Sequence, residues 1–199
     1  MNGPPLPVVF PDDLPDDVRR ALAPGTTLPD SQGRPRTLPS MFMRIESWQQ
    51  AREVPLSPHF MLWELIDCDV REAPVVREFP RYVPCALLLL ASALEVFRLE
   101  VGTYVHVAAN GGYRSPEHAL SRQASRHCWG TAANLYRIGD IYLDSESEIA
   151  RYAAVARRVL PGVWIRPYGP GDGEANDHLH LDIGYTVFDP PELNNGITT

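Results

Sequence analysis

The chain has few cysteines and no pair of them. Cys68, Cys85 and Cys128 form an odd, scattered set without a CxxC motif, so neither a disulfide scaffold nor a cysteine-rich zinc knot is indicated. A free cysteine is usually a small buried hydrophobic residue. Cys128 lies next to a histidine, so the roles of soft metal ligand and of nucleophile remain open for it.

Long apolar segments are also missing. The longest apolar run, residues 83–94, is too short to span a bilayer and contains Pro84. The first residues lack the basic start and the apolar stretch of a secretory signal. We therefore expect no membrane span and synthesis in the cytoplasm. Work outside the cell would then require release by lysis or carriage on a phage-like particle.

Positive charge is in deficit, since the net charge is -7 and the isoelectric point is about 5.3. An acidic chain has no general attraction for nucleic acid or for anionic membranes, so nucleic acid is not an expected partner. The length of 199 residues fits one domain with a sizeable core and an extension.

Proline is concentrated near the start of the chain, because residues 1–39 hold nine of the twenty prolines. Such a segment favours an extended arm that docks on a protein partner or on its own domain. Within it, residues 12–23 could form a short helix and residues 26–39 resemble a loop. Residues 41–52 follow with a helical pattern.

The rest of the chain mixes helical and strand patterns. The segment 84–100 is apolar nearly all round, which is typical of a buried central helix. Helices are predicted at 57–66, 115–123 and 145–160, and strands at 104–108, 131–138, 163–167 and 178–185. This order predicts an α+β fold with a small, mostly antiparallel sheet, a buried central helix and flanking helices.

The segment 177–182 reads Asp-His-Leu-His-Leu-Asp. On a strand, His178, His180 and Asp182 share one face, and the leucines share the other. The leucine face belongs to the core, so the histidine face is either solvated or part of a site. Asp177 directly precedes the strand, where twist could bring its carboxylate toward the histidines.

Two further segments carry polar residues suited to chemistry. His127 precedes a predicted strand that contains Asn134, and Gly130 between them can supply the turn that lets both converge. Arg114 follows a glycine turn, where a guanidinium can bind a substrate carboxylate or form a surface salt bridge.

These motifs together resemble a known family. Gly112-Tyr113-Arg114-Ser115-Pro116, then Ser125-x-His127-x-x-Gly130-x-Ala132-x-Asn134, then Asp177-His178-x-His180 follow the motif order of the D-alanyl-D-alanine carboxypeptidase-type zinc peptidases, in the superfamily of Hedgehog domains and lysostaphin-type enzymes. The segment Ser57-Pro58-His59-Phe60, with Glu64, resembles the opening of the phage-type branch. The resemblance covers residues 56–186, leaving 1–55 as a proline-rich extension and 187–199 as a tail.

The resemblance implies one zinc ion and peptidoglycan peptides as substrates. It makes His127 and His180 zinc ligands, with Asn134 where the family has an aspartate ligand. It implies a general base at Asp177, oxyanion stabilisation by His178, and substrate binding by Arg114 and Ser125. An amide oxygen can coordinate zinc but brings no negative charge, so zinc would bind more weakly than in the family.

Three hypotheses follow. The first is a zinc-dependent peptidoglycan peptidase, acting as a D-Ala-D-Ala carboxypeptidase or as a cell-wall endopeptidase. The second is a metal-deficient pseudo-peptidase that serves as a binding or assembly module, for example in a phage tail or injection particle. The third is a cysteine hydrolase that uses Cys128 with a histidine nearby.

Overall fold

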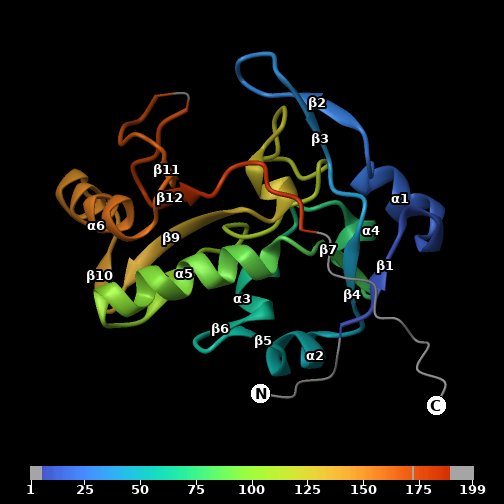
Figure 1. The fold of residues 1–199 in the computed structure, drawn as a ribbon, viewed down its shortest axis with the longest axis horizontal. Coiled ribbons are helices and arrows are strands. Elements are labelled where there is room, and N and C mark those ends of the chain that lie inside the picture. Colours follow the sequence, from blue (N-terminus) through green and yellow to red (C-terminus); the bar gives the residue numbers. More distant parts are fainter. Residues whose placement is uncertain (1–5, 172, 189–199) are drawn as a thin grey trace.

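An antiparallel sheet of five strands carries the candidate site (Figure 1). The computed structural model describes residues 6–171 and 173–188. Four of the strands follow the order β10-β9-β12-β11, and β8 pairs with β9 off this path. Their bounds are β10 Ile141–Tyr142, β9 Ala132–Ile138, β12 Leu179–Asp182, β11 Trp164–Ile165 and β8 Val105–Val107. The mostly antiparallel sheet of the predicted α+β fold is thereby confirmed.

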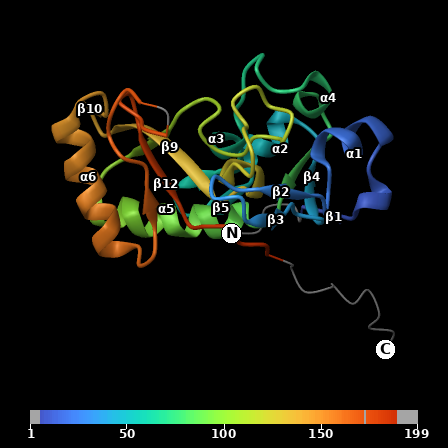
Figure 2. The same cartoon turned by 90° about the horizontal axis from the view of Figure 1, so that it is seen from above.

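Helix α5, Leu87–Val101, is the predicted central helix (Figures 1 and 2). Leu87, Leu90, Leu94 and Phe97 recur at helical spacing and are all fully buried. Burying a side chain of this size contributes about 1.5–3 kcal/mol to folding. Helix α6, Glu146–Val159, begins at the cap Ser145 and contacts both α5 and β12. The two helices cover one face of the sheet, so chemistry is confined to the other face.

A β-bulge in β9 shapes that other face. His106 of β8 lies opposite Arg137, but Val107 lies opposite Leu135, which leaves Tyr136 as the extra residue. Leu135 is buried in the core, whereas Asn134, Tyr136 and Arg137 are only half-buried. A bulge bends its strand and redirects side chains. Here it places two neighbouring residues, Tyr136 and Arg137, on the face that also bears Asn134.

The first part of the chain is built into the same core. β4, Phe42–Ile45, pairs with β1, Val8–Val9, and with β7, Arg81–Pro84. Helix α1, Asp16–Leu22, packs its apolar side into the main hydrophobic cluster. The segment predicted as an extension outside the domain therefore packs, over residues 6–55, on its own chain. Residues 1–5 of that segment lie outside the described residues, as does most of the predicted tail.

A hairpin in the predicted loop 26–39 contacts the candidate site. It consists of β2, Thr27–Pro29, and β3, Pro35–Thr37. The Ala124 amide donates to the Pro29 carbonyl at 3.0 Å, and Trp129 Nε1 donates to the Thr37 carbonyl at 3.0 Å. The hairpin thus supports the segment 124–129, which contains His127.

Two predicted helices begin with strands. The segment 41–52 forms β4 and then α2, Trp48–Glu53, which Ser47 caps. The segment 57–66 opens with the short hairpin of β5, Pro55–Ser57, and β6, Phe60–Met61, before α3, Leu62–Ile66. Strand pairing with β1 and β7 outweighs the helical periodicity in the first of these segments.

The helix predicted at 115–123 is absent, and turns replace it. The Ser115 amide and hydroxyl both donate to the buried Glu72 carboxylate, at 2.9 and 2.6 Å. His118 accepts from the Leu120 amide through Nδ1, at 3.0 Å. Side chains therefore take up the groups that a helix would use. The remaining elements are the 3₁₀ turns η1, Pro11–Asp13, and η2, Arg126–Trp129, and helix α4, Pro74–Arg77.

Across the described ranges, none of the helices combines the length and the apolar character that a membrane crossing demands.

Glu95 of α5 fastens the β5–β6 hairpin to the central helix. Its carboxylate accepts from Ser57 Oγ at 2.9 Å, from the His59 amide at 3.0 Å and from His59 Nδ1 at 2.6 Å. Burial raises the pKa of Glu95, but these hydrogen bonds outweigh burial and leave the pKa below its ordinary value. The stabilisation is complete above the ordinary glutamate pKa and is lost as pH falls through the lowered one.

We predict that Glu95→Gln lowers the free energy of unfolding by about 1–2 kcal/mol near neutral pH, because an amide offers three donors a single neutral acceptor. The difference from the wild type should shrink as pH falls from neutral through the lowered pKa of Glu95, because the carboxylate then becomes protonated. Urea unfolding over a series of pH values measures this difference. Glu100→Gln is the matched control, since Glu100 lies on the exposed end of the same helix. Equal losses in the two variants would contradict the role of Glu95.

Candidate functional site

The pairing of β9 with β12 brings two of the predicted ligands together. His180 lies directly opposite Asn134 in the antiparallel register. His127 comes from η2, and Gly130, with a φ of 68°, turns the chain from η2 into β9. The turn predicted at Gly130 is therefore present. A side chain at a positive φ is strained, so glycine suits this position.

The two histidine rings are in contact. Their centroids are 5.1 Å apart with an interplanar angle of 64°. His180 Nδ1 lies 2.8 Å from Asn134 Oδ1. His127 Nδ1 lies 2.7 Å from the Gly112 carbonyl, which can only accept, so Nδ1 carries the proton. His127 Nε2 is then a free lone pair, buried and without a hydrogen-bond partner.

Asp182 lies on the far side of His180, and sequence reasoning gave it no role. Its Oδ2 is 3.4 Å from His180 Nε2, within ion-pair distance but outside hydrogen-bond geometry. Its Oδ1 is 3.2 Å from Arg126 Nε. The guanidinium of Arg126 stacks on Trp164 and on Tyr185. The alternation His178, His180, Asp182 was the signal that could have identified this carboxylate.

The histidines of the site are neutral near pH 7. Burial lowers the pKa of His180 to about 4, with Arg166 adding to the effect and Asp182 opposing it. Burial likewise lowers the pKa of His127 well below its ordinary value, and nearby Arg114 and His180 lower it further. Neutral imidazoles keep lone pairs, and lone pairs are what a metal or a proton needs.

His178 and Asp177 form a pair at the start of β12. His178 Nδ1 lies 2.5 Å from Asp177 Oδ1, and since a carboxylate only accepts, Nδ1 donates. The Asp177 side chain is 79% exposed, whereas His178 Nε2 is buried without a partner. Burial lowers the pKa of His178 even though Asp177 raises it. The buried atom of the pair that can accept a proton is therefore His178 Nε2.

Arg114 stands beside His127 at the end of a tight glycine turn. Its amide donates to the His127 carbonyl at 3.3 Å, and its side chain is buried with Nε unpartnered. Burial lowers the pKa of Arg114 to about 10, so it stays charged at neutral pH. A Cβ on Gly112 would lie 2.1 Å from the Leu65 carbonyl oxygen. Only glycine therefore fits the turn that presents this guanidinium.

Ser125 and Cys128 lie in the segment that carries His127. The Ser125 carbonyl accepts from the Cys128 amide at 2.9 Å, and no hydrogen bond of the Ser125 hydroxyl occurs among the described residues. The Cys128 thiol is buried, its sulfur lies 3.5 Å from Ser121 Oγ, and burial raises its pKa to about 11. A nucleophilic cysteine needs an accessible thiolate, so the cysteine-hydrolase hypothesis is not supported.

Two of the side chains carry donor atoms of the kind that the implied zinc ion would need. Histidine ligands must be neutral with a free lone pair, and His127 Nε2 meets this condition as an unpartnered buried atom. Asn134 supplies an oxygen beside His180. Within the described part of the chain, no three His, Cys, Asp or Glu side chains are grouped to hold a metal, so an amide would have to be the third ligand.

Comparison with protein-family models, with curated proteins and with solved structures finds no match for this chain.

We predict that Asp182→Asn lowers the free energy of unfolding by about 2–4 kcal/mol, because it removes the only carboxylate that the described residues place against Arg126 and leaves a neutral amide in a buried position. Asp177→Asn makes the same chemical change at an exposed carboxylate and should cost less than about 0.5 kcal/mol. Urea unfolding of the two variants compares them. A loss for Asp182→Asn no larger than that for Asp177→Asn would show that the Arg126–Asp182 contact contributes nothing to stability.

Proposed function

We propose that this chain is a zinc-dependent peptidase that acts on short peptidoglycan peptides ending in a free carboxylate. One observation supports it above the others: two neutral, buried histidines lie in contact, and the free Nε2 of His127 has no partner in the folded chain. A buried unsatisfied nitrogen is costly, so its retention favours a ligand that completes it. The resemblance of the motif order to zinc peptidases adds the substrate class.

His127 through Nε2, His180 through Nδ1 and Asn134 through Oδ1 would hold the ion. A zinc ion bound there supplies a Lewis acid that polarises a carbonyl group. Arg114 binds the terminal carboxylate of the peptide, with Arg166 as a second nearby positive charge. The buried guanidinium of Arg114 and the half-buried one of Arg166 select an anionic end group and orient the peptide before any bond is broken.

The Asp177–His178 pair takes up the proton of the attacking water. Because Asp177 accepts from His178 Nδ1, it fixes the tautomer in which His178 Nε2 is the acceptor. The buried Nε2 faces inward while the Asp177 carboxylate is exposed. We therefore assign the general base to His178 and the orienting role to Asp177, which reverses the roles that the family resemblance implies.

Peptidoglycan lies outside the cytoplasmic membrane. Under this proposal the peptidase reaches its substrate after lysis or as cargo of a phage-like particle.

A second function, metal-free peptide binding, has its own observation. Neutral His180 carries one proton, and two acceptors compete for it, Asn134 Oδ1 and Asp182 Oδ2. With the proton on Nδ1, His180 donates a hydrogen bond to Asn134 Oδ1, and this bond occupies both atoms in place of a metal. With the proton on Nε2, directed at Asp182, Nδ1 is free to bind the ion. The proline-rich arm no longer supports this alternative, because residues 6–55 pack on the chain itself.

We predict that Asn134→Asp raises zinc affinity by about tenfold or more, because a carboxylate adds the negative charge that the ligand set lacks. Peptide hydrolysis should rise with it. The measurements are zinc content after dialysis and release of D-alanine from Nα-acetyl-L-Lys-D-Ala-D-Ala, for the wild type and the variant. Asn134→Gln is the control, since it keeps the amide and moves its oxygen.

Zinc peptidase function requires that the wild type bind zinc when zinc is added and lose hydrolysis with EDTA. A wild type that takes up no zinc, while still binding the peptide, would leave the metal-free function in its place.

We also predict different losses of kcat for the two members of the proton-moving pair. His178→Gln should lower kcat by about 10²–10⁴, the usual contribution of a general base, whereas Asp177→Asn should lower it by about tenfold. Steady-state kinetics over a range of pH gives both values. The reverse order of losses would restore Asp177 as the base.

A further inference from the structure

A row of rings crosses three neighbouring strands of the site sheet. Tyr104 directly precedes β8, His106 lies in β8, Tyr136 lies in β9 and Tyr142 lies in β10. Successive ring centroids along this tyrosine row are 6.3, 6.0 and 6.3 Å apart. Tyr136 is two residues from Asn134 on β9, so the row lies on the face of the sheet that bears the candidate site.

Both ends of the tyrosine row are open to solvent. Tyr104 is 69% exposed and Tyr142 is 55% exposed, whereas the two rings between them are half-buried. Single exposed rings are ordinary on a protein surface, but contiguous ones mark a surface that binds something. The row is therefore a candidate binding surface in its own right.

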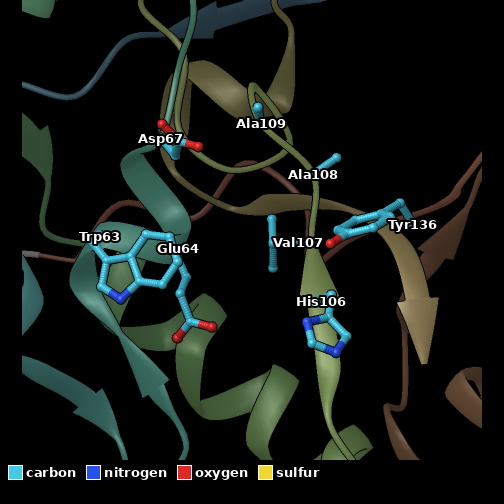
Figure 3. A pocket seen from close by; sticks show the side chains of 8 residues that line it. All are labelled: Trp63, Glu64, Asp67, His106, Val107, Ala108, Ala109 and Tyr136. Atoms are coloured by element: carbon cyan, nitrogen blue, oxygen red, sulfur yellow. The ribbon is translucent and has the colours of Figure 1, made fainter. Parts of the chain in front are cut away.

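A groove continues the tyrosine row toward α3. Figure 3 shows His106 and Tyr136 on one side of the groove and the α3 side chains of Trp63 and Glu64 on the other. The groove has a volume of about 390 Å³, and Asp67 also lines it. Trp63 is 39% exposed, so its ring can contact a ligand. The row and the groove together form one surface with rings on both sides of a hollow.

Hydrogen-bonding groups lie among these rings. Glu64 Oε2 accepts from the Met61 amide at 2.7 Å, and no donor to Glu64 Oε1 occurs among the described residues. Arg137 Nη2 lies 3.2 Å from His106 Nε2, and a guanidinium only donates, so Nε2 accepts. Burial and Arg137 lower the pKa of His106, so the ring is neutral near pH 7 and carries its proton on Nδ1. The surface thus offers acceptors on the α3 side and a donor on the β8 side.

Charges of both signs surround the groove, and this favours a neutral ligand. Glu64 and Asp67 are the carboxylates of the α3 side. Arg81 Nη1 donates to the carbonyl of Ile66, the residue before Asp67, at 3.0 Å, so a positive charge stands at that end of α3. On the other side, the guanidinium of Arg137 lies toward the rings of β9 and β10. Neither a cation nor an anion therefore finds a surface of one opposite sign.

A sugar ring matches these features. A pyranose has apolar C–H faces, which stack on aromatic rings, and a rim of hydroxyl groups, which donate to carboxylates and accept from N–H groups. The steps of 6.0–6.3 Å along the tyrosine row are close to the length of one sugar unit in a chain. A protein partner would instead cover an apolar centre from which water is excluded. In this surface His106 and Arg137 stand among the rings, which suits a ligand with both apolar faces and hydroxyls.

We propose that the tyrosine row and the groove bind a neutral oligosaccharide. One sugar ring lies in the groove against Trp63, with hydroxyl groups that donate to Glu64 and Asp67. The following sugar rings stack along the tyrosine row. This is a binding activity beyond the proposed hydrolysis, and it requires neither zinc nor a peptide.

The probe is N-acetylchitotetraose, a neutral tetramer of N-acetylglucosamine. Calorimetry on the full chain, with and without EDTA, gives its dissociation constant, which should be the same in both conditions. Tyr104→Ala, Tyr142→Ala and Trp63→Ala should each weaken binding by about threefold to tenfold, because each removes one stacking ring. Tyr142→Phe keeps the ring and should keep most of the affinity.

Phe10→Ala is the matched control, because it removes a ring that is 48% exposed from another part of the chain and should leave the affinity unchanged. Thermal unfolding checks that each variant is folded, and the two exposed tyrosine variants decide the matter if Trp63→Ala is not. A wild type that does not bind the tetramer, or ring variants that bind it as tightly as the wild type, overturns the proposal.

Sedimentation of the same variants tests the other use of such a surface. If the wild type is a dimer that the tyrosine variants convert to a monomer, without any change in sugar binding, the row is a contact between copies of the chain and the sugar site is overturned. Hydrolysis of the peptide without binding of the tetramer leaves the peptidase and removes the sugar site. Binding of the tetramer without hydrolysis does the reverse.

Discussion

The register between β9 and β12 is the constraint on which the site depends. It places His180 opposite Asn134 and, two residues on, Asp182 opposite Ala132. All four residues of β12 are buried, so its polar side chains depend on protein groups: His180 Nδ1 bonds to Asn134, and Asp182 Oδ1 lies against Arg126. His180 is held between an amide and a carboxylate for this reason. A shift of one residue in the β9–β12 register would point His180 into the core, where the leucines now lie, and would abolish its contacts with Asn134 and Asp182.

Burial then determines the electrical character of the site. It lowers the pKa values of the three histidines, so the imidazoles are neutral while the neighbouring guanidiniums remain charged. A cleft with neutral bases and positive arginines attracts an anion and keeps lone pairs available.

The N-terminal segment is a structural part of the site. Its hairpin bonds to Ala124 and Trp129, on both sides of His127, and Arg36 stacks on Tyr185, which in turn stacks with Arg126. Contacts of this kind hold the His127 segment although it has little regular structure of its own. Proline content alone favoured an extended arm, because local composition does not report strand pairing with distant residues.

Strong periodicity was sufficient for much of the fold. Helices α5 and α6 and strands β9 and β12 follow from their patterns, because apolar spacing in a long segment has one structural solution. The helix predicted at 115–123 was wrong, because the Ser115–Glu72 hydrogen bonds outweigh local propensity. The helix predicted at 41–52 is present only from Trp48 on, because the residues before it pair as β4 with β7. The order of Arg114, His127 and His180 along the chain is by itself enough to indicate a candidate site. Tertiary structure alone decided that Asp182 supports His180, that the inner nitrogen of the Asp177–His178 pair belongs to the histidine, and that a groove adjoins Tyr136. These features depend on distances between residues far apart in sequence and on which atoms lose water, and a one-dimensional pattern specifies neither.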